Sequence, residues 1–500
     1  MHAGWLVYAV RGYLLLLPSL DSIRPRERCF FLVCNLMPNI LYLCCFNFKF
    51  NTHREWLKFY FMISAWTISF SQSRWRQCAK SACRCDATRR SLNCWRSGIS
   101  ILTPDLVAPV DLLNIDLGTN RLRTLHKSTF KGMRSLAELD MFDNRVEYLP
   151  AGIFDSLVNL RILRLQRNYL EEIDSEAFRH TKNLFHVDLS NNFLYTLPER
   201  LFSNNSFLET IDISNNHVMY VPSDSFLGLD SLLILDLSKN KIQRIENGTF
   251  ILKTLQILKL SDNKIFNISE RAFESLVSLE TLLIDRNKLQ NLPNFLFYNL
   301  NCLTFLDLSN NNLMSLSGVE FERLKRLRTL DLKENTLSEL PDFLFSNCTN
   351  LEKLDLSRNK LRYLNGTTFH GLQNLTSLLL SENKLYQVHF KTFSTLKNLT
   401  TLYMDGNMFP SLPSRTFDYM PKLAIIWDYS PTCVSPWYLE GHFLKKLKFP
   451  ELCSGQWASM VNLSPRLPIQ QLLALNVSVN RKPQDSMEQN HDVTTVDAWH

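Results

Sequence analysis

The sequence predicts a solenoid of parallel strands, and three repeating features lead to that prediction. Thirteen asparagines recur through the middle of the chain, with eleven of their twelve intervals at 24 residues and one at 23. Each lies in the apolar phrase L-x-x-L-x-L-x-x-N-x-L, and a phenylalanine follows eighteen residues after its first apolar position. One such coil cannot bury its own apolar face, whereas stacked coils bury a continuous core. The asparagines are Asn120, Asn144, Asn168, Asn192, Asn216, Asn240, Asn263, Asn287, Asn311, Asn335, Asn359, Asn383 and Asn407. The phenylalanines are Phe130, Phe154, Phe178, Phe202, Phe226, Phe250, Phe273, Phe297, Phe321, Phe345, Phe369, Phe393 and Phe417.

Each part of the repeat has a predicted role. The L-x-L pair alternates with a period of two, which predicts a short strand whose leucines face the core. The asparagine follows where the chain turns off the strand, and its amide can satisfy backbone groups of neighbouring coils, so we expect a ladder of asparagines. The phenylalanines predict a buried spine on the convex side. Thirteen parallel strands at ~4.8 Å spacing predict a concave sheet about 60 Å long.

The phrase resembles that of leucine-rich repeat proteins over residues 109–422, and the 24-residue period with phenylalanine resembles the subclass typical of extracellular proteins. The resemblance extends to the ectodomains of Toll-like receptors, Slit, chondroadherin and the acid-labile subunit. It implies an α/β solenoid in the form of a horseshoe, with a parallel concave sheet, an irregular or 3₁₀ convex side and disulfide caps.

Residues 74–108 resemble the N-terminal cysteine cap of this family. Four cysteines, Cys78, Cys83, Cys85 and Cys94, lie just before the first repeat. Family pairing implies the disulfides Cys78–Cys85 and Cys83–Cys94. A zinc site built from the same four cysteines is the alternative, but the exposed end of a solenoid core must be covered, which favours the cap.

Residues 423–455 resemble a degenerate C-terminal cysteine cap. The family pattern opens with C-x-C and uses four cysteines, whereas here only Cys433 and Cys453 are present, so we expect one bridge between them. Cys348 stands three residues before the first leucine of its repeat, which predicts a buried apolar substitute. Cys302 occupies a different phase, so we do not expect it to pair with Cys348.

Residues 1–73 are predicted to be a leader. They contain apolar stretches at 5–20, 29–48 and 59–70. The last follows the basic residues Lys49, Arg54 and Lys58, so we expect a secretory signal with release after Ser73. The alternatives are that translation starts at Met37 or that the first 36 residues are a gene-model extension. In the rival interpretation the 29–48 stretch is retained as a membrane anchor. Residues 456–500 read as a polar tail.

Disulfide caps require an oxidising compartment, so we expect an extracellular protein, secreted or at the cell surface. Nine N-x-[ST] sequons agree with this location. Two of them, at Asn374 and Asn398, precede the first leucine of a repeat, where asparagine is also common for structural reasons. The predicted glycosylation sites are Asn204, Asn247, Asn267, Asn347, Asn365, Asn374, Asn398, Asn462 and Asn476.

The formal net charge of +7 is concentrated before the first repeat. Between Arg74 and Arg96 there are seven Lys and Arg against one acid, Asp86. This basic cap could attract sulfated glycans or acidic proteins, or it could simply be solvated. Nucleic acid is not expected in this compartment. No catalytic motif, phosphate loop or recurring metal-ligand set occurs, so we predict a binding protein without cofactor or metal rather than an enzyme.

A ligand is expected on the concave sheet. Most repeats carry aspartate between the two leucines of L-x-L, either as an acidic binding row or as the commonest form of this repeat. Exposed aromatics beside arginine are typical of interface hot spots, and we expect such a patch in repeats two to four. Phe142, Phe185 and His186 are expected about 5–10 Å apart, with the arginines on the intervening repeat. The predicted function is protein recognition in adhesion, matrix or receptor roles; the alternative is the truncated ectodomain of a transmembrane receptor. The patch residues are Phe142, Arg164, Arg167, Phe185 and His186.

Overall fold

The computed structural model describes residues 83–102, 111–410, 412–413 and 416–423 with their side chains, and the backbone of six further strands. The chain forms two units, Met1–Ser81 and Ala82–His500. In the first unit, β1 (Trp5–Val10), β2 (Tyr13–Pro18), β3 (Phe30–Met37) and β4 (Ile40–Phe46) pair in order as an antiparallel sheet. The predicted release site after Ser73 lies outside the described residues.

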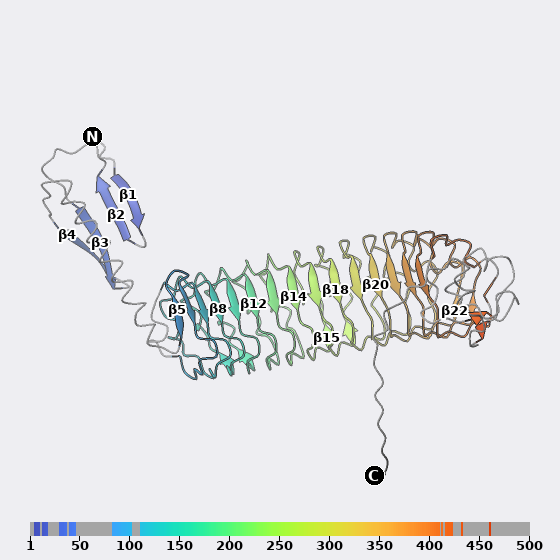
Figure 1. Ribbon diagram of the computed structural model, residues 1–500, viewed down its shortest axis with the longest axis horizontal. Coiled ribbons are helices and arrows are strands. Elements are labelled where there is room, and N and C mark those ends of the chain that lie inside the picture. The colour runs from blue at the N-terminus through green and yellow to red at the C-terminus, as the bar shows by residue number, and fades with distance from the viewer. Residues whose placement is uncertain are drawn as a thin grey trace, which may run out of the picture. The chain divides into compact units, whose positions relative to one another are not determined.

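The second unit is a solenoid with one sheet of fifteen strands along it (Figure 1). Every neighbouring pair is parallel, apart from the antiparallel β5–β6. The strands are β5 (Arg84–Asp86), β6 (Ser91–Asn93), β7 (Asn114–Asp116), β8 (Glu138–Asp140), β10 (Ile162–Arg164), β12 (His186–Asp188), β13 (Thr210–Asp212), β14 (Ile234–Asp236), β16 (Ile257–Lys259), β18 (Thr281–Leu283), β19 (Phe305–Asp307), β20 (Thr329–Asp331), β21 (Lys353–Asp355), β23 (Ser377–Leu379) and β25 (Thr401–Tyr403).

The opposite side of each coil consists of turns and three short parallel pairs, and the described residues contain no helix. The pairs are β9 (Tyr148–Leu149) with β11 (Glu172–Ile173), β15 (Arg244–Ile245) with β17 (Asn267–Ile268), and β22 (Tyr363–Leu364) with β24 (Gln387–Val388). Near the chain's end, β26 (Thr432–Cys433) pairs antiparallel with β27 (Met460–Val461).

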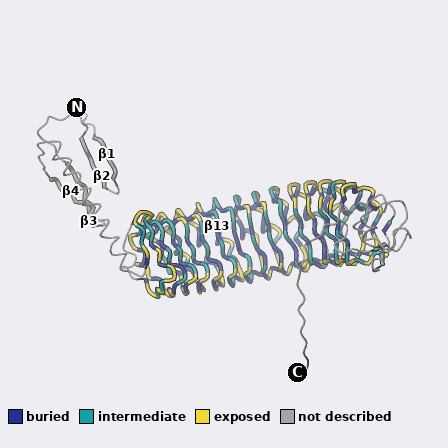
Figure 2. Tube along the Cα trace, in the orientation of Figure 1, coloured by how far each residue is buried: buried dark blue, intermediate teal, exposed yellow. Residues whose placement is uncertain are grey.

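The core repeats from coil to coil, as Figure 2 shows by the recurrence of buried residues. The middle residue of every coil strand is buried because its side chain points away from the outer face of the sheet. The predicted phenylalanine spine is confirmed: the members from Phe130 to Phe393 are less than 2% exposed. Eight neighbouring pairs stack, with ring centroids 5.4 to 6.4 Å apart.

The asparagine ladder is also confirmed. Each Oδ1 accepts a backbone N–H of the preceding coil at 2.9 to 3.1 Å. Each Nδ2 donates to a carbonyl of the preceding coil at 2.8 to 3.0 Å. A buried polar group without a partner is destabilising, so one amide per coil satisfies the turn of its neighbour.

The N-terminal cap continues the sheet. β6 pairs with β7, and the backbone N–H of Cys94 donates to the carbonyl of Asp116 at 2.7 Å. Cys83 and Cys94 form a disulfide with their Cα atoms 4.3 Å apart, consistent with an N-terminal cap. Cys85 is also disulfide-bonded. Its expected partner Cys78 lies outside the described residues, and the Cys78–Cys85 pairing stays a prediction.

Two of the remaining cysteine predictions concern described residues, and the third involves a residue outside them. Cys348 is free and fully buried, as predicted for an apolar substitute, and burial raises the pKa of its thiol to about 12. Cys302 is free as well. Cys433 lies in β26, but Cys453 lies outside the described residues, so the C-terminal bridge stays a prediction.

Candidate protein-binding surface

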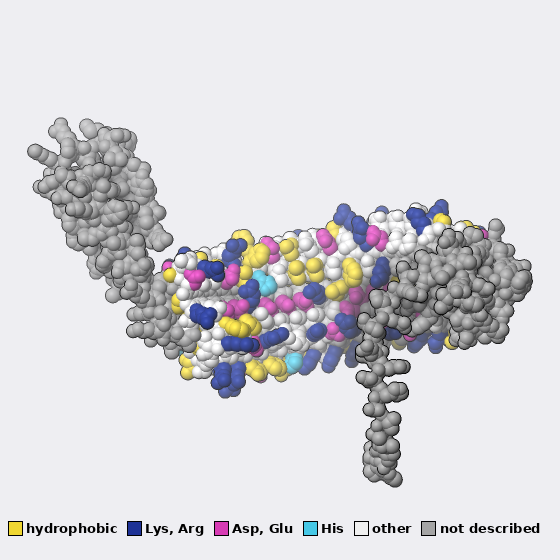
Figure 3. Space-filling view, in the orientation of Figure 1, with side chains coloured by type: hydrophobic (Ala, Val, Ile, Leu, Met, Phe, Trp, Pro, Cys, Tyr) yellow, Lys and Arg dark blue, Asp and Glu magenta, His cyan; other side chains and the backbone are white. Residues whose placement is uncertain are grey.

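The outer surface of the fifteen-stranded sheet, called the sheet face below, carries the variable side chains. In each coil strand the first and third residues flank the buried middle residue and point outward. Figure 3 shows acidic side chains in a row along this face. They include eight aspartates at the third strand position, Asp116, Asp140, Asp188, Asp212, Asp236, Asp307, Asp331 and Asp355.

These aspartates have a structural role. In each of the eight, Oδ1 accepts the backbone N–H two residues further on, at 2.8 to 3.0 Å. That bond holds the turn at the end of the strand, as aspartate commonly does. The turn geometry therefore accounts for the acidic row without a ligand.

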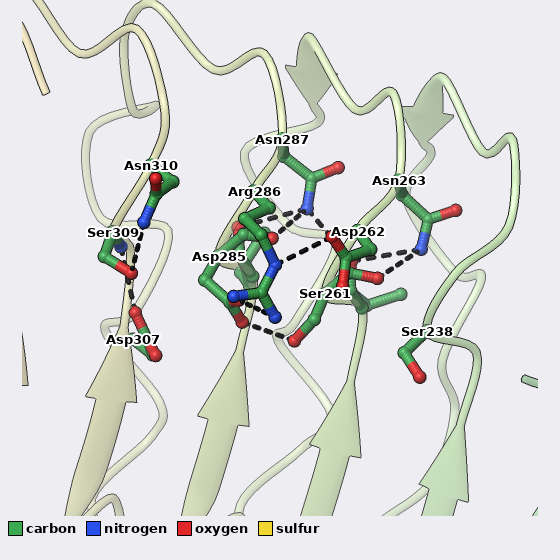
Figure 4. Close-up of polar contacts among 12 residues, drawn as sticks. Ser238, Ser261, Asp262, Asn263, Asp285, Arg286, Asn287, Asp307, Ser309 and Asn310 are labelled. Carbon is green, nitrogen blue, oxygen red and sulfur yellow. Dashed lines mark hydrogen bonds and ion pairs between the residues drawn. The ribbon is translucent and has the colours of Figure 1, made fainter. Parts of the chain in front are cut away.

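The acidic row is interrupted where the strand ends in another residue, and the turn is then held differently (Figure 4). Lys259 and Leu283 interrupt it once, and there the hydroxyl of Ser261 donates to Asp285 of the next coil. Arg286 pairs with Asp285 at 2.8 Å and with Asp262 at 2.7 Å. A second interruption, at Leu379 and Tyr403, has the matching bond from Ser381 to Asp405, 2.6 Å long. Together with Arg164, which ends β10 between Asp140 and Asp188, these residues interrupt the acidic row in three places.

Burial, with a smaller contribution from neighbouring carboxylates, raises the pKa of four aspartates in the row. Burial raises the pKa of Asp140, Asp212 and Asp307 above the usual aspartate value. Burial, together with the charges of the neighbouring Asp355 and Asp307, raises the pKa of Asp331 to about 6. These carboxylates therefore protonate more readily than exposed ones.

Three of the five predicted patch residues come together. Arg164 at the end of β10 is 3.7 Å from Asp140, and its side chain is 37% exposed. His186 begins β12, paired with Ile162 of β10, and Phe185 precedes it with 36% of its surface exposed. Burial lowers the pKa of His186, and Arg164 lowers it further while Asp188 opposes both. Arg164, Phe185 and His186 form what we call the face patch.

The other two residues lie elsewhere along their coils, and the ligand-binding role of all five stays a prediction. Phe142 follows β8 and Phe185 precedes β12, with β10 between those strands. The two phenylalanines are therefore at opposite ends of strands two coils apart. Phe142 covers Gly118 of the previous coil, and Arg167 is exposed in the turn beyond β10. Position along the coil separates the two groups, and repeat number alone does not reveal it.

Exposed aromatics at the edge of the sheet face were missed. Tyr169, Phe193 and His217 each follow the ladder asparagine of their coil, and Tyr195 and Met219 lie two residues after Phe193 and His217. The sequence carries a signal for them, because three consecutive repeats have a ring at the same position. This position follows the strand and the ladder asparagine, outside the outward strand positions that predict a concave binding face.

The described sequons lie away from the sheet face. Asn374 and Asn398 each donate Nδ2 to a carbonyl 25 residues earlier, at 2.9 Å, which is the structural use of asparagine expected at that position. Asn267 lies in β17, on the side opposite the sheet. Asn204, Asn247, Asn347 and Asn365 also lie outside the sheet strands, whereas Asn462 and Asn476 lie outside the described residues. Glycosylation of these sites stays a prediction.

Two of the four arginines in the described part of the basic cap are paired with acids. Arg89 and Arg90 lie 3.7 Å from Asp86 and Asp111. Arg96 lies over the exposed ring of Trp95, 4.5 Å from its centroid. The sulfated-glycan site stays a prediction. Across the described residues there is no cluster of metal-ligating side chains, and no helix long and apolar enough to cross a membrane.

Comparison with known proteins shows which family has this repeat and which solved structures have a similar fold. The family model "Leucine rich repeat" matches seven overlapping segments, 110–170, 158–218, 206–252, 234–289, 278–337, 325–385 and 373–426. A search of curated protein sequences found no significant match. Among solved structures, the Drosophila Toll–Spatzle complex is similar at 27% identity and a TM-score of 0.58, over 66% of this chain and 46% of that one. This chain thus spans less than half of the length of that structure.

Two further structures resemble the fold alone. A plant peptide hormone receptor, RGFR1 in complex with RGF2, matches at 21% identity and a TM-score of 0.46, over 64% of this chain and 55% of that one. A chain of the complex of Latrophilin 3, Unc5D and FLRT2 matches at 24% identity and a TM-score of 0.45, over 75% of this chain and 99% of that one.

Proposed function

Because this chain belongs to the leucine-rich repeat family, we propose that it is an extracellular binding protein that recognises a protein ligand on its sheet face. Proteins of this family typically use the solenoid fold to bind other proteins. The Toll structure, to which this chain is similar at 27% identity, is a complex with the protein Spatzle. The observation that carries the proposal is the face patch, an exposed ring beside a histidine and an arginine on adjacent strands.

The make-up of the sheet face supports a protein ligand. Aromatic and arginine side chains dominate the energetics of protein interfaces. The aspartate row would repel a polyanion, so the same face is poorly suited to nucleic acid. The described sequons all lie off the sheet strands, so glycans attached there would leave the face open.

We propose secretion, with release near Ser73, as the form in which this protein acts in adhesion, matrix or receptor recognition. The alternative is the ectodomain of a transmembrane receptor. N-terminal sequencing of the product from expressing cells and from their medium separates these outcomes. Recovery of residues 29–48 in a membrane-bound product would contradict release after Ser73.

The ligand proposal is tested by screening the secreted chain against a panel of extracellular proteins and repeating each positive with Arg164→Ala/Phe185→Ala. A hot spot should weaken binding by ~2 kcal/mol or more. The matched control is Thr329→Ala/Lys353→Ala, two outward side chains on β20 and β21. Asp331 is unsuitable as a control because its carboxylate holds the Lys333 turn. Equal losses for both pairs, or no loss for the first, would reject the face patch.

A second candidate function is sulfated-glycan binding by the cap. It is favoured by Arg84 and Arg96, which make no ion pair with the described residues, and by the exposed Trp95. Retention on immobilised heparin should fall for Arg84→Ser/Arg96→Ser at physiological salt. Unchanged retention would exclude these arginines.

A further inference from the structure

A second exposed surface lies on the edge of the solenoid, beside the sheet face. Residues at one repeat position, directly after the ladder asparagine, form a single row along this edge. Each donates its backbone N–H to the coil before it, at 2.8 to 3.0 Å, so the row is held rigidly by the solenoid. From the second to the eighth coil, the members of the row are Arg145, Tyr169, Phe193, His217, Lys241, Lys264 and Lys288.

The aromatic half of the row is apolar and exposed. Tyr169 stacks on Phe193 with centroids 5.6 Å apart, and His217 packs edge-on against Phe193 at 5.5 Å and Tyr195 at 5.7 Å. Tyr169, Tyr195 and Met219 are 47 to 49% exposed, and Phe193 is 38% exposed. Together they expose on the order of 400 Å², within the range of the largest apolar patch on a typical monomer, which is often functional. We call these five residues the edge patch.

The next three residues of the row, after the aromatic ones, are basic. Lys241, Lys264 and Lys288 occupy the next three places in the row, and none makes an ion pair with the described residues. The space-filling view shows hydrophobic side chains, a histidine and then basic side chains in succession along the edge (Figure 3). Glu147, near the aromatic end, is neutralised by Arg123 at 2.9 Å, while Glu171 stays exposed there. The favourable place for a negative partner is therefore the lysine end.

We propose that this edge binds an extended protein segment in which an apolar anchor is followed by acidic side chains. The anchor would cover the edge patch and the acids would reach the three lysines. From Phe193 to Lys288 the row spans four coils, about 19 Å, which an extended chain covers in about six residues. Rings fixed in advance contribute buried area at low entropy cost, and unpaired lysines add charge complementarity.

A protein segment fits better than an anionic membrane. A flat membrane laid on the edge would also bring its phosphates toward the neighbouring aspartate row and Glu171, whereas a narrow segment covers the edge alone. The inference is independent of the proposed function, because the edge patch and the face patch share no residue. Variants of one surface therefore test it without touching the other.

The probe is a displayed library of random twelve-residue peptides, selected on the full chain and counter-selected on Phe193→Ser/Tyr195→Ser. Peptides that need the patch should carry an apolar pair followed within about six residues by two or more acids. Their affinity, by fluorescence anisotropy, should fall at least tenfold with Phe193→Ser/Tyr195→Ser and with Lys241→Glu/Lys264→Glu. It should also weaken with added salt.

The control is Met314→Ser/Tyr386→Ser, which removes exposed apolar side chains elsewhere on the same edge and should change nothing. Thermal melting checks folding, and Tyr169→Ser replaces the double variant if that one melts early. No patch-dependent peptide, or peptides without acids, would overturn the proposal. So would affinity unaffected by the lysine changes, binding to phosphatidylserine vesicles that needs the edge patch, or self-association that Phe193→Ser/Tyr195→Ser abolishes.

Discussion

At the scale of single residues, the turn after each strand places an ordinary residue in a left-handed conformation. The residue before the ladder asparagine has positive φ in all thirteen coils: 50 to 56° in twelve non-glycine residues and 66° at Gly406. Only glycine, and to a lesser extent asparagine and aspartate, adopt this conformation readily. Thr, Arg, Lys and Glu occur there as well, so residue type did not reveal the strain in advance. The repeat geometry imposes it.

Thr119→Asn is therefore expected to stabilise the protein. Thr119 has φ of 53°, and a β-branched side chain is strained there, so the change should raise the free energy of unfolding by ~1 kcal/mol. Chemical denaturation measures the difference. Asn310→Thr, at the same repeat position with φ of 53°, should lose a similar amount. If both substitutions raised the free energy of unfolding, or both lowered it, the backbone strain would not be the cause.

Asp331 is expected to make stability depend on pH. Its pKa is raised to about 6 from 3.8, so the folded state favours the protonated acid. This contribution is fully present below pH 3.8 and is lost as the pH rises through about 6. Asp331→Asn keeps an acceptor for the Lys333 N–H and should stabilise by ~1 kcal/mol at pH 7.5, after allowing for solvent screening. At pH 3.5 the gain should vanish.

Melting curves at both pH values decide this prediction. Asp230→Asn, at an exposed site away from the sheet face, controls for the loss of one charge alone. A gain for Asp331→Asn that is equal at the two pH values would show that the aspartate row does not cause it.

At the scale of elements, the spacing of residues in the sequence predicted the features that recur in every coil. It did not predict the features that occur only once. The strands, the asparagine ladder and the phenylalanine spine follow from a fixed period, because in-phase residues meet in neighbouring coils. The cap strands β5 and β6 were not predicted, since the segment around Cys85 lacks the apolar phrase. The face patch was only partly predicted. Phe142 and Phe185 are close in repeat number but occupy opposite ends of their strands, which only coil geometry reveals.

Close packing between coils should make one glycine far more sensitive than another. A Cβ on Gly371 would lie 2.3 Å from the carbonyl oxygen of Ser346, at φ of +90°, whereas a Cβ on Gly248, at φ of +78°, meets nothing within 4 Å. Gly248→Ala should lose ~1 kcal/mol from the backbone alone. Gly371→Ala should lose ~3 kcal/mol or more, because the coils must also separate. Equal losses on denaturation would mean that the coils relax freely.

At the scale of the whole molecule, stability is expected to be local rather than shared. Each coil touches only its neighbours, so a solenoid behaves approximately as a one-dimensional chain of coupled units. A defect at one end should open the nearest coils and leave distant ones closed. The cap is where this matters most, because β6 and Cys94 cover the Leu112 end of the core.

Cys83→Ser removes the Cys83–Cys94 disulfide and tests this expectation. Loss of a structural disulfide typically destabilises by 2–5 kcal/mol, here concentrated at the cap. Hydrogen exchange followed by mass spectrometry should show faster exchange of β7 and β8 amides, while β19 and β20 stay protected. Less protein should also reach the medium. Cys348→Ala, which removes a buried free thiol, should instead loosen β20 and β21 and leave the cap unchanged. Uniform loss of protection along the sheet after Cys83→Ser would mean that the solenoid unfolds as one unit.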